Sequence, residues 1–122
     1  MSIQFDTVIT GGTVVTAGDQ MRCDVGIKDG RIAMLGHNLG QAQTVIDAKD
    51  KLVLPGGIDS HVHISQPSGE GIVMADDFES ATRSAALGGT TTVMPFVLQE
   101  KGRPLRETVN DYHALAKGQC FI

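Results

Sequence analysis

Three polar residues spaced two apart, Asp59, His61 and His63, are the part of this sequence best suited to chemistry. They end an apolar, strand-like segment and directly precede a loop rich in glycine, proline and serine. Because side chains at positions i and i+2 share one face of a strand, both imidazoles can bind a single cation. Neutral imidazoles suit zinc and related divalent metals. The spacing therefore predicts His61 and His63 as metal ligands, with Asp59 placed to orient an imidazole or to lie under the metal.

A His-x-His pair alone is weak evidence, because short motifs of this kind often arise by chance. Ligation is favoured by the position of the pair at the C-terminal end of a first barrel-type strand, where α/β barrels keep their active sites. Other candidates have simpler explanations. His37 is expected in an exposed turn, and His113 and Lys117 on or just after a solvated helix. Ser65 and Ser68 have no neighbouring base to make either a nucleophile.

Residues 7–54 have the pattern of short strands separated by glycine and aspartate turns. The pair Asp29-Gly30 between two strand-like runs is a strong hairpin signal. Gly11-Gly12 similarly suggests a hairpin between the runs on either side of it. The strands predicted in this region cover residues 7–10, 13–16, 24–28, 31–35, 44–47 and 51–54.

From residue 57 onward the pattern changes to alternating strands and helices. Asp76, with Glu79 three residues later, predicts a capped helix that Gly88-Gly89 ends. A second helix is expected from Pro104 to Gly118. Strands are predicted at residues 57–63, 90–95 and 120–122. This β-α-β-α-β order predicts an α/β unit of parallel strands with right-handed crossovers.

Composition excludes several classes of partner. The chain of 122 residues has a formal net charge of −4 and a pI near 5.4. It therefore has no broad positive field to attract nucleic acid or an anionic membrane. Cys23 and Cys120 form no CxxC pair, which fits a reducing compartment and predicts a cytoplasmic protein. No signal peptide or membrane span is indicated, and a small neutral or anionic metabolite remains a suitable ligand.

Three segments together resemble the opening of cyclic amidohydrolases, closest to dihydropyrimidinases and hydantoinases. They are residues 54–63 (LPGGIDSHVH), 75–83 (ADDFESATR) and 87–91 (LGGTT). The resemblance covers essentially the whole chain. It implies the N-terminal fragment of a metal-dependent TIM-barrel amidohydrolase. Residues 1–55 would supply strands of a small β-sandwich, and residues 56–122 would form the start of an incomplete (β/α)8 barrel.

The resemblance also implies a chemistry and a set of partners. His61 and His63 would hold one ion of a two-zinc site, while a bridging carboxylated lysine, two further histidines and an aspartate base would lie beyond Ile122. The metals activate water as hydroxide, which opens a dihydropyrimidine or hydantoin ring to an N-carbamoyl amino acid. The substrate is therefore a small cyclic amide, and a homo-oligomer is expected. This chain on its own is expected to be inactive.

Related functions remain as alternatives. Dihydroorotases typically carry an arginine two residues after the second histidine and an asparagine after Met-Pro, and this sequence has Ser65 and Phe96 there. These two residues do not exclude an allantoinase-like cyclic amidohydrolase. Met94-Pro95-Phe96 stands where an Asp-Phe pair is common in hydantoinases. A non-catalytic dihydropyrimidinase-like assembly protein is disfavoured by the two histidines, and a β-rich binding module by the unpaired edge that three parallel strands would leave.

Overall fold

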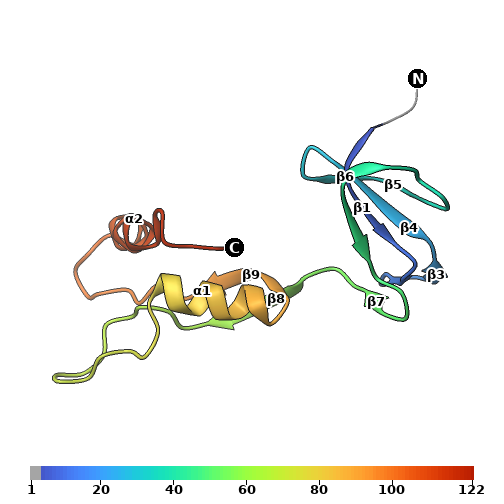
Figure 1. Ribbon diagram of the computed structural model, residues 1–122. Coiled ribbons are helices and arrows are strands. Elements are labelled where there is room, and N and C mark those ends of the chain that lie inside the picture. Colours follow the sequence, from blue (N-terminus) through green and yellow to red (C-terminus); the bar gives the residue numbers. More distant parts are fainter. Residues whose placement is uncertain (1–3) are drawn as a thin grey trace. The chain divides into compact units, whose positions relative to one another are not determined.

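The computed structural model (Figure 1) describes residues 4–122, so the first three residues of the predicted unit 1–55 lie outside it. The chain separates into two compact units, one ending at Pro55 and the other beginning at Gly56. Among the described residues, strands β1 to β7 belong to the first unit. The second unit contains β8, α1, β9 and α2 in that order. The change of pattern seen in the sequence therefore coincides with a change of architecture.

Two mixed sheets make up the first unit, in the strand orders β5-β4-β1-β6 and β3-β2-β7. In each sheet a central strand pairs antiparallel with one neighbour and parallel with the other. Thus β1 is antiparallel to β4 and parallel to β6, while β2 is antiparallel to β3 and parallel to β7. The strands are β1 Phe5–Thr10, β2 Thr13–Val15, β3 Gln20–Arg22, β4 Asp24–Lys28, β5 Arg31–Gly36, β6 Ala42–Asp47 and β7 Leu52–Val53.

The core of the first unit joins the two sheets. Val14 from β2 and Val25 from β4 are buried in one cluster with Cys23. Ile9 of β1 and Val53 of β7 pack against this cluster. Because each sheet can bury only one hydrophobic face, sharing a core removes apolar surface of both from water.

Of the two predicted hairpins, only the one at Asp29-Gly30 is confirmed. Asp29 and Gly30 have φ angles of 50° and 71° and connect β4 to β5 with Lys28 opposite Arg31. The predicted pairing across Gly11-Gly12 is wrong, because β1 already has β4 and β6 on its two sides. Strand β2 pairs instead with β3, which the sequence analysis missed, through a tight turn closed by Thr16 N–H donating to Asp19 O at 2.8 Å.

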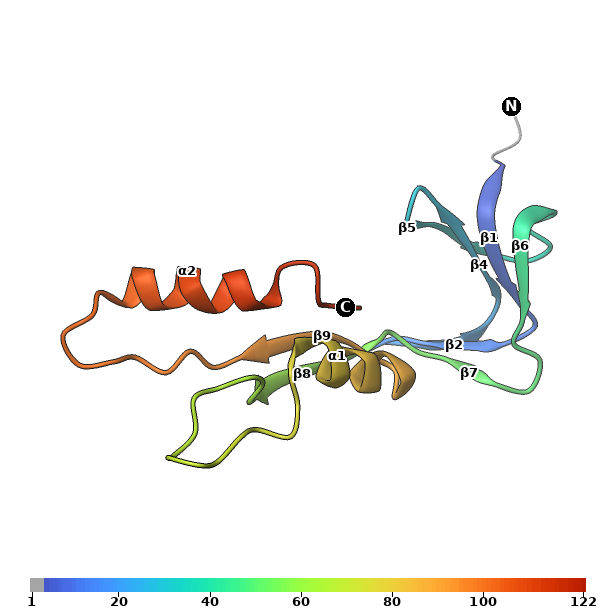
Figure 2. The ribbon, with the colours of Figure 1, turned by 60° about the vertical axis from the view of Figure 1, so that its left-hand side comes forward.

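The second unit is built on two parallel strands, β8 (Gly57–Val62) and β9 (Thr90–Pro95), as predicted. Helix α1 (Phe78–Leu87) connects them, and α2 (Leu105–Ala116) follows β9 (Figure 2). The predicted strand at residues 120–122 is wrong. The N–H of Phe121 donates to Thr82 Oγ1 at 3.1 Å, so this backbone group is bound to α1 instead of to β9.

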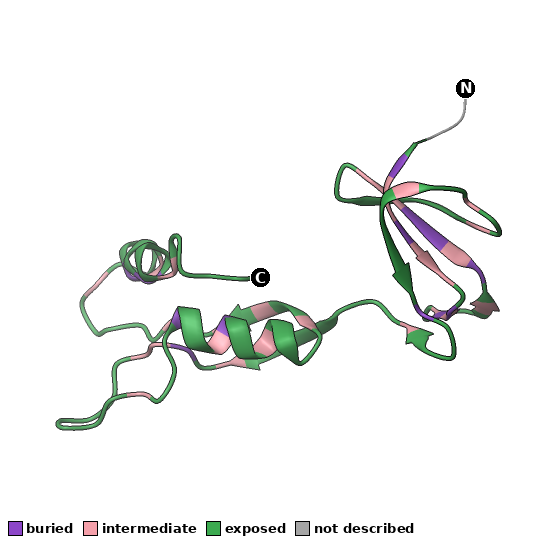
Figure 3. Ribbon diagram, viewed as in Figure 1, coloured by how far each residue is buried: buried purple, intermediate pink, exposed green. Residues whose placement is uncertain are grey.

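The core of the second unit is centred on Ile64, whose side chain is fully buried. It lies in a cluster with Phe78 of α1 and Tyr112 of α2, whose rings meet edge to face at a centroid distance of 5.1 Å. The Tyr112 hydroxyl donates to the Ile64 carbonyl, and burial raises the pKa of that hydroxyl. Most of β8 is exposed by contrast (Figure 3). The apolar contacts that hold the unit together are therefore concentrated on one side of its short sheet.

Helix α1 begins one residue later than the sequence predicted. Asp77, not Asp76, is the N-cap, and its carboxylate accepts the N–H of Ser80 at 2.8 Å. The capping box is completed by Ser80, whose hydroxyl accepts the Asp77 N–H, instead of by Glu79. The predicted stop is confirmed, since Gly88 is the C-cap and Gly89 has a φ of 85°.

Ile64→Ala should destabilise the protein by roughly 2–5 kcal/mol, because it leaves a cavity in a closely packed, buried cluster. Ile72→Ala removes the same atoms from a residue that is 66% exposed, and should change stability by less than about 0.5 kcal/mol. Urea-induced unfolding measures both. Equal effects of the two substitutions would show that Ile64 is not the centre of this core.

The cap of α1 can be tested by pH. The Ser80 N–H lowers the pKa of Asp77 below its ordinary 3.8, so the ionised cap stabilises the fold above that pH. Asp77→Ala should lower the melting temperature at neutral pH, and this loss should shrink only as the pH falls below 3.8. Asp76→Ala is the matched control and should have the smaller effect. A larger effect of Asp76→Ala would instead show that Asp76 is the N-cap, as predicted from the sequence.

Candidate metal-binding site

The candidate site lies on the face of β8 and β9 opposite the core. Val62 and Ile64 point into the cluster with α1 and α2, and Val93 does so from β9. The alternate residues His61 and His63 are therefore directed to the other face, where both are exposed. The register shifts between Asp59 and Val62, so that β8 has an extra residue beside the His61 position. Such bulges re-aim side chains and are frequent next to active sites.

The structure brings the two predicted ligands together. The ring centroids of His61 and His63 are 5.3 Å apart. The ring of Phe96, just after β9, contacts both of them, at 4.3 Å from the His61 centroid and stacked at 5.6 Å from that of His63. Two imidazoles thus sit beside an aromatic ring that covers part of the pair and leaves the remainder open.

A hydrogen-bonded link holds one imidazole and not the other. His63 Nδ1 lies 2.7 Å from Gln66 Oε1, and Gln66 Nε2 donates to the carbonyl oxygen of Phe96. The Phe96 N–H in turn donates to Val62 O at 3.2 Å, which ties the ends of β8 and β9 together. For His61, the structure of residues 4–122 shows no hydrogen bond to the ring. Its position rests on strand geometry and on Phe96.

Asp59 contacts the backbone instead of a ring. Its Oδ1 accepts the N–H of His61 at 3.0 Å, inside the irregular part of β8. An N–H that has lost its ladder partner at a bulge is satisfied in this way. The carboxylate therefore helps to fix the strand that carries His61, while the role of orienting an imidazole stays a prediction.

The remaining residues considered from the sequence do not join the pair. His37 is exposed and lies in the first unit, and His113 is exposed on α2. Within the described part of the chain, no three His, Cys, Asp or Glu side chains are grouped closely enough to hold a metal ion. Residues 4–122 therefore supply two imidazole donors and no third ligand.

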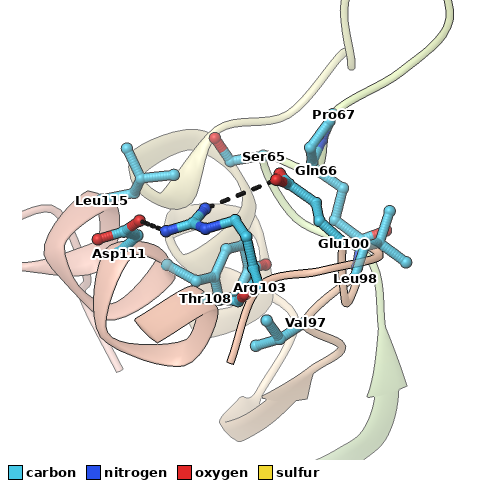
Figure 4. A pocket seen from close by; sticks show the side chains of 11 residues that line it. Ser65, Gln66, Pro67, Val97, Leu98, Glu100, Arg103, Thr108, Asp111 and Leu115 are labelled. Atoms are coloured by element: carbon cyan, nitrogen blue, oxygen red, sulfur yellow. Dashed lines mark hydrogen bonds and ion pairs between the residues drawn. The ribbon is translucent and has the colours of Figure 1, made fainter. Parts of the chain in front are cut away.

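A cavity of about 370 Å³ opens beside the site, between the loops that follow β8 and β9 and helix α2. Figure 4 shows Arg103 held there between Glu100 and Asp111, with its Nη2 2.6 Å from the Asp111 carboxylate. Both neighbours raise the pKa of Arg103, Asp111 most strongly. Gln66 lines the same cavity. The sequence analysis missed this cavity and the link through Gln66, because Gln66 is held by the Phe96 carbonyl, which lies thirty residues further along the chain.

Solved structures identify the class of fold. A crystal structure of D-hydantoinase matches with a TM-score of 0.90 and 49% sequence identity, covering 95% of this chain and 25% of that one. A crystal structure of dihydropyrimidinase from Brevibacillus agri NCHU1002 matches with a TM-score of 0.89 and 40% identity over the same shares. The chain has a small α/β fold that corresponds to the N-terminal part of the hydantoinase structures.

Sequence relatives agree with this class. D-hydantoinase from Streptomyces coelicolor is 48% identical over 122 residues, which is 95% of this chain and 26% of the relative. An allantoinase from Bacillus licheniformis is 36% identical over 98% of this chain and 27% of its own length. No family model matches the sequence. The predicted resemblance to dihydropyrimidinases and hydantoinases is confirmed, and the chain spans about a quarter of the length of the curated relatives it matches.

Among residues 4–122, neither helix is long and apolar enough to cross a membrane.

Proposed function

We propose that this chain is the N-terminal quarter of a metal-dependent hydrolase that opens cyclic amides of the dihydropyrimidine and hydantoin type to N-carbamoyl amino acids. The observation that carries the proposal is the pair of imidazoles, His61 and His63, at the carboxyl end of β8 in a chain 48% identical to a D-hydantoinase. Allantoin is the less favoured ring, because the allantoinase from Bacillus licheniformis is only 36% identical.

The two imidazoles fit a divalent metal such as zinc. Nitrogen ligands lie about 2.0–2.1 Å from zinc, and at a tetrahedral angle two such rings have centroids roughly 5 Å apart. The centroids of His61 and His63 are 5.3 Å apart, and both rings lie on one exposed face. When bound, the metal supplies Lewis-acid chemistry, polarising a carbonyl oxygen and lowering the pKa of water.

The chain's own residues have separate parts in this proposal. His61 and His63 bind the ion, and Asp59 fixes the backbone of His61 through its N–H. The ring of Phe96 packs against both imidazoles and keeps water from that side of the pair. The bridging lysine, the second histidine pair and the general base belong to the part of the enzyme outside these residues.

The wider architecture belongs to the same proposal. We assign the second unit to the start of a (β/α)8 barrel and the first unit to strands of a small β-sandwich. Ile58, Met94 and Phe96 on the site face of the sheet are 65%, 53% and 43% exposed, which suits strands that the remainder of a barrel would cover. A homo-oligomer and a cytoplasmic location are part of the proposal, the latter supported by the free thiols of Cys23 and Cys120.

In the enzyme of full family length, His61→Ala or His63→Ala should remove bound metal and nearly all ring opening of dihydrouracil or hydantoin. Each substitution deletes a donor from a site that needs about four. Elemental analysis of the purified variants measures metal content, and His113→Ala, an exposed histidine of α2, is the matched control. Full metal content in both site variants would refute the ligand assignment. Absence of both bound metal and turnover in the unmodified enzyme would favour the assembly protein.

The 122-residue chain alone should show no metal-dependent turnover, even with zinc in excess. A zinc site needs about four donors, or three and a water, and residues 4–122 bring together only two imidazoles. Purified chain and full-length enzyme can be assayed side by side on hydantoin, with mass measured in solution. Turnover by the monomeric 122-residue chain would show that no further residues are required.

A further inference from the structure

The amide of Gln66 can be oriented unambiguously from its partners. Its two ends face the carbonyl oxygen of Phe96 and Nδ1 of His63. A backbone carbonyl oxygen can only accept hydrogen bonds, so the amide end that faces Phe96 has to be the NH2 group. The opposite end, facing His63 at 2.7 Å, is consequently the amide oxygen.

The orientation of the amide determines the protonation of the imidazole. An amide oxygen also only accepts, so Nδ1 of His63 has to carry the proton. A neutral imidazole has one N–H, which leaves the lone pair on Nε2. The carbonyl of Phe96, at the end of the neighbouring strand, thus selects Nε2 of His63 as the atom available to a metal.

We infer that Gln66 is a positioning residue that fixes the tautomer and the ring orientation of His63 so that Nε2 binds the metal. The inference rests on the proposed function for the metal, but the tautomer itself does not. Histidine ligands commonly donate their second ring N–H to an acceptor in this manner, and the acceptor raises the basicity of the ligating nitrogen. Here the acceptor is the neutral amide of Gln66, which is itself held by the Phe96 carbonyl at the end of β9. The orientation of His63 therefore depends on the pairing of β8 with β9.

The link also distinguishes the two histidines. In the structure of residues 4–122 the ring of His61 has no comparable acceptor, and its contact with Phe96 is a tilted ring packing at a centroid distance of 4.3 Å. Loss of the Gln66 side chain should therefore free the ring of His63 and leave that of His61 in place. If Gln66 only held the loop in place, its loss would not affect the two rings differently.

The test uses Gln66→Leu, which removes both hydrogen bonds, and Gln66→Glu, which keeps an acceptor for Nδ1–H. Gln99→Leu, the same change at an exposed residue of the following loop, is the matched control. Nitrogen-15 NMR of the metal-free, histidine-labelled enzyme at mildly alkaline pH reports the tautomer, with His63→Ala used to assign its signal. Zinc affinity is measured separately by competition with a chelator.

In the unsubstituted enzyme and in Gln99→Leu, His63 should carry its proton on Nδ1 alone. Gln66→Leu should populate the Nε2–H tautomer and weaken zinc binding by about 10–100-fold, whereas Gln66→Glu should keep the Nδ1–H tautomer and most of the affinity. An unchanged tautomer in Gln66→Leu would overturn the inference whatever the affinity. Failure of the unsubstituted enzyme to bind zinc would instead refute the proposed function, while the tautomer would still decide the role of Gln66.

Discussion

The burial of Ile64 is the constraint on which the rest of the second unit depends. Its side chain is fully enclosed by Phe78 and Tyr112, and its carbonyl accepts the Tyr112 hydroxyl. Because side chains alternate along an extended chain, a residue fixed so firmly on one face forces its predecessor, His63, onto the other. The core on one side of the sheet therefore determines which residues are available for chemistry on the opposite side.

Ion pairs contribute little to this arrangement by comparison. The pairs Arg22–Asp50, Arg83–Glu79 and Arg103–Asp111 all have at least one largely exposed partner. Exposed pairs of this kind typically add between 0 and about 1 kcal/mol each, whereas full burial of one large aliphatic side chain adds about 1.5–3 kcal/mol. Apolar burial around Ile64 and along the shared core of the first unit accordingly holds the two units in shape.

Local sequence signals predicted those features that depend on neighbouring residues. The turn at Asp29-Gly30, the helix stop at Gly88-Gly89 and the shared face of His61 and His63 follow from φ preferences and strand periodicity, and the structure has all three. Features set by distant partners were not predictable in this way. Strand β2 pairs with β3 because both sides of β1 were already taken, and Phe121 donates to Thr82 instead of extending the sheet.

The candidate site shows the same contrast between features set by neighbouring residues and features set by distant ones. The shared face of His61 and His63 was predictable from a spacing of two residues, but the approach of Phe96 to both rings required the register of β9 against β8. The acceptor for His63 was equally hidden, because Gln66 is held by a carbonyl thirty residues further along the chain. Local periodicity therefore predicts that the two histidines share a face, whereas long-range pairing, which no single stretch of sequence specifies, brings their neighbours to them.

The loop after β8 is closed at its own base, where the N–H of Ser65 donates to the carbonyl of Asp76 at 3.1 Å. Ile64 and Phe78 anchor the chain on either side of that bond. The number of residues in the segment 67–75 therefore has little effect on the spacing of β8 and α1, and lengthening such a loop costs little entropy. During evolution this segment can gain or lose residues at its tip without moving the histidines, and in the laboratory it is a natural place to insert a reporter domain.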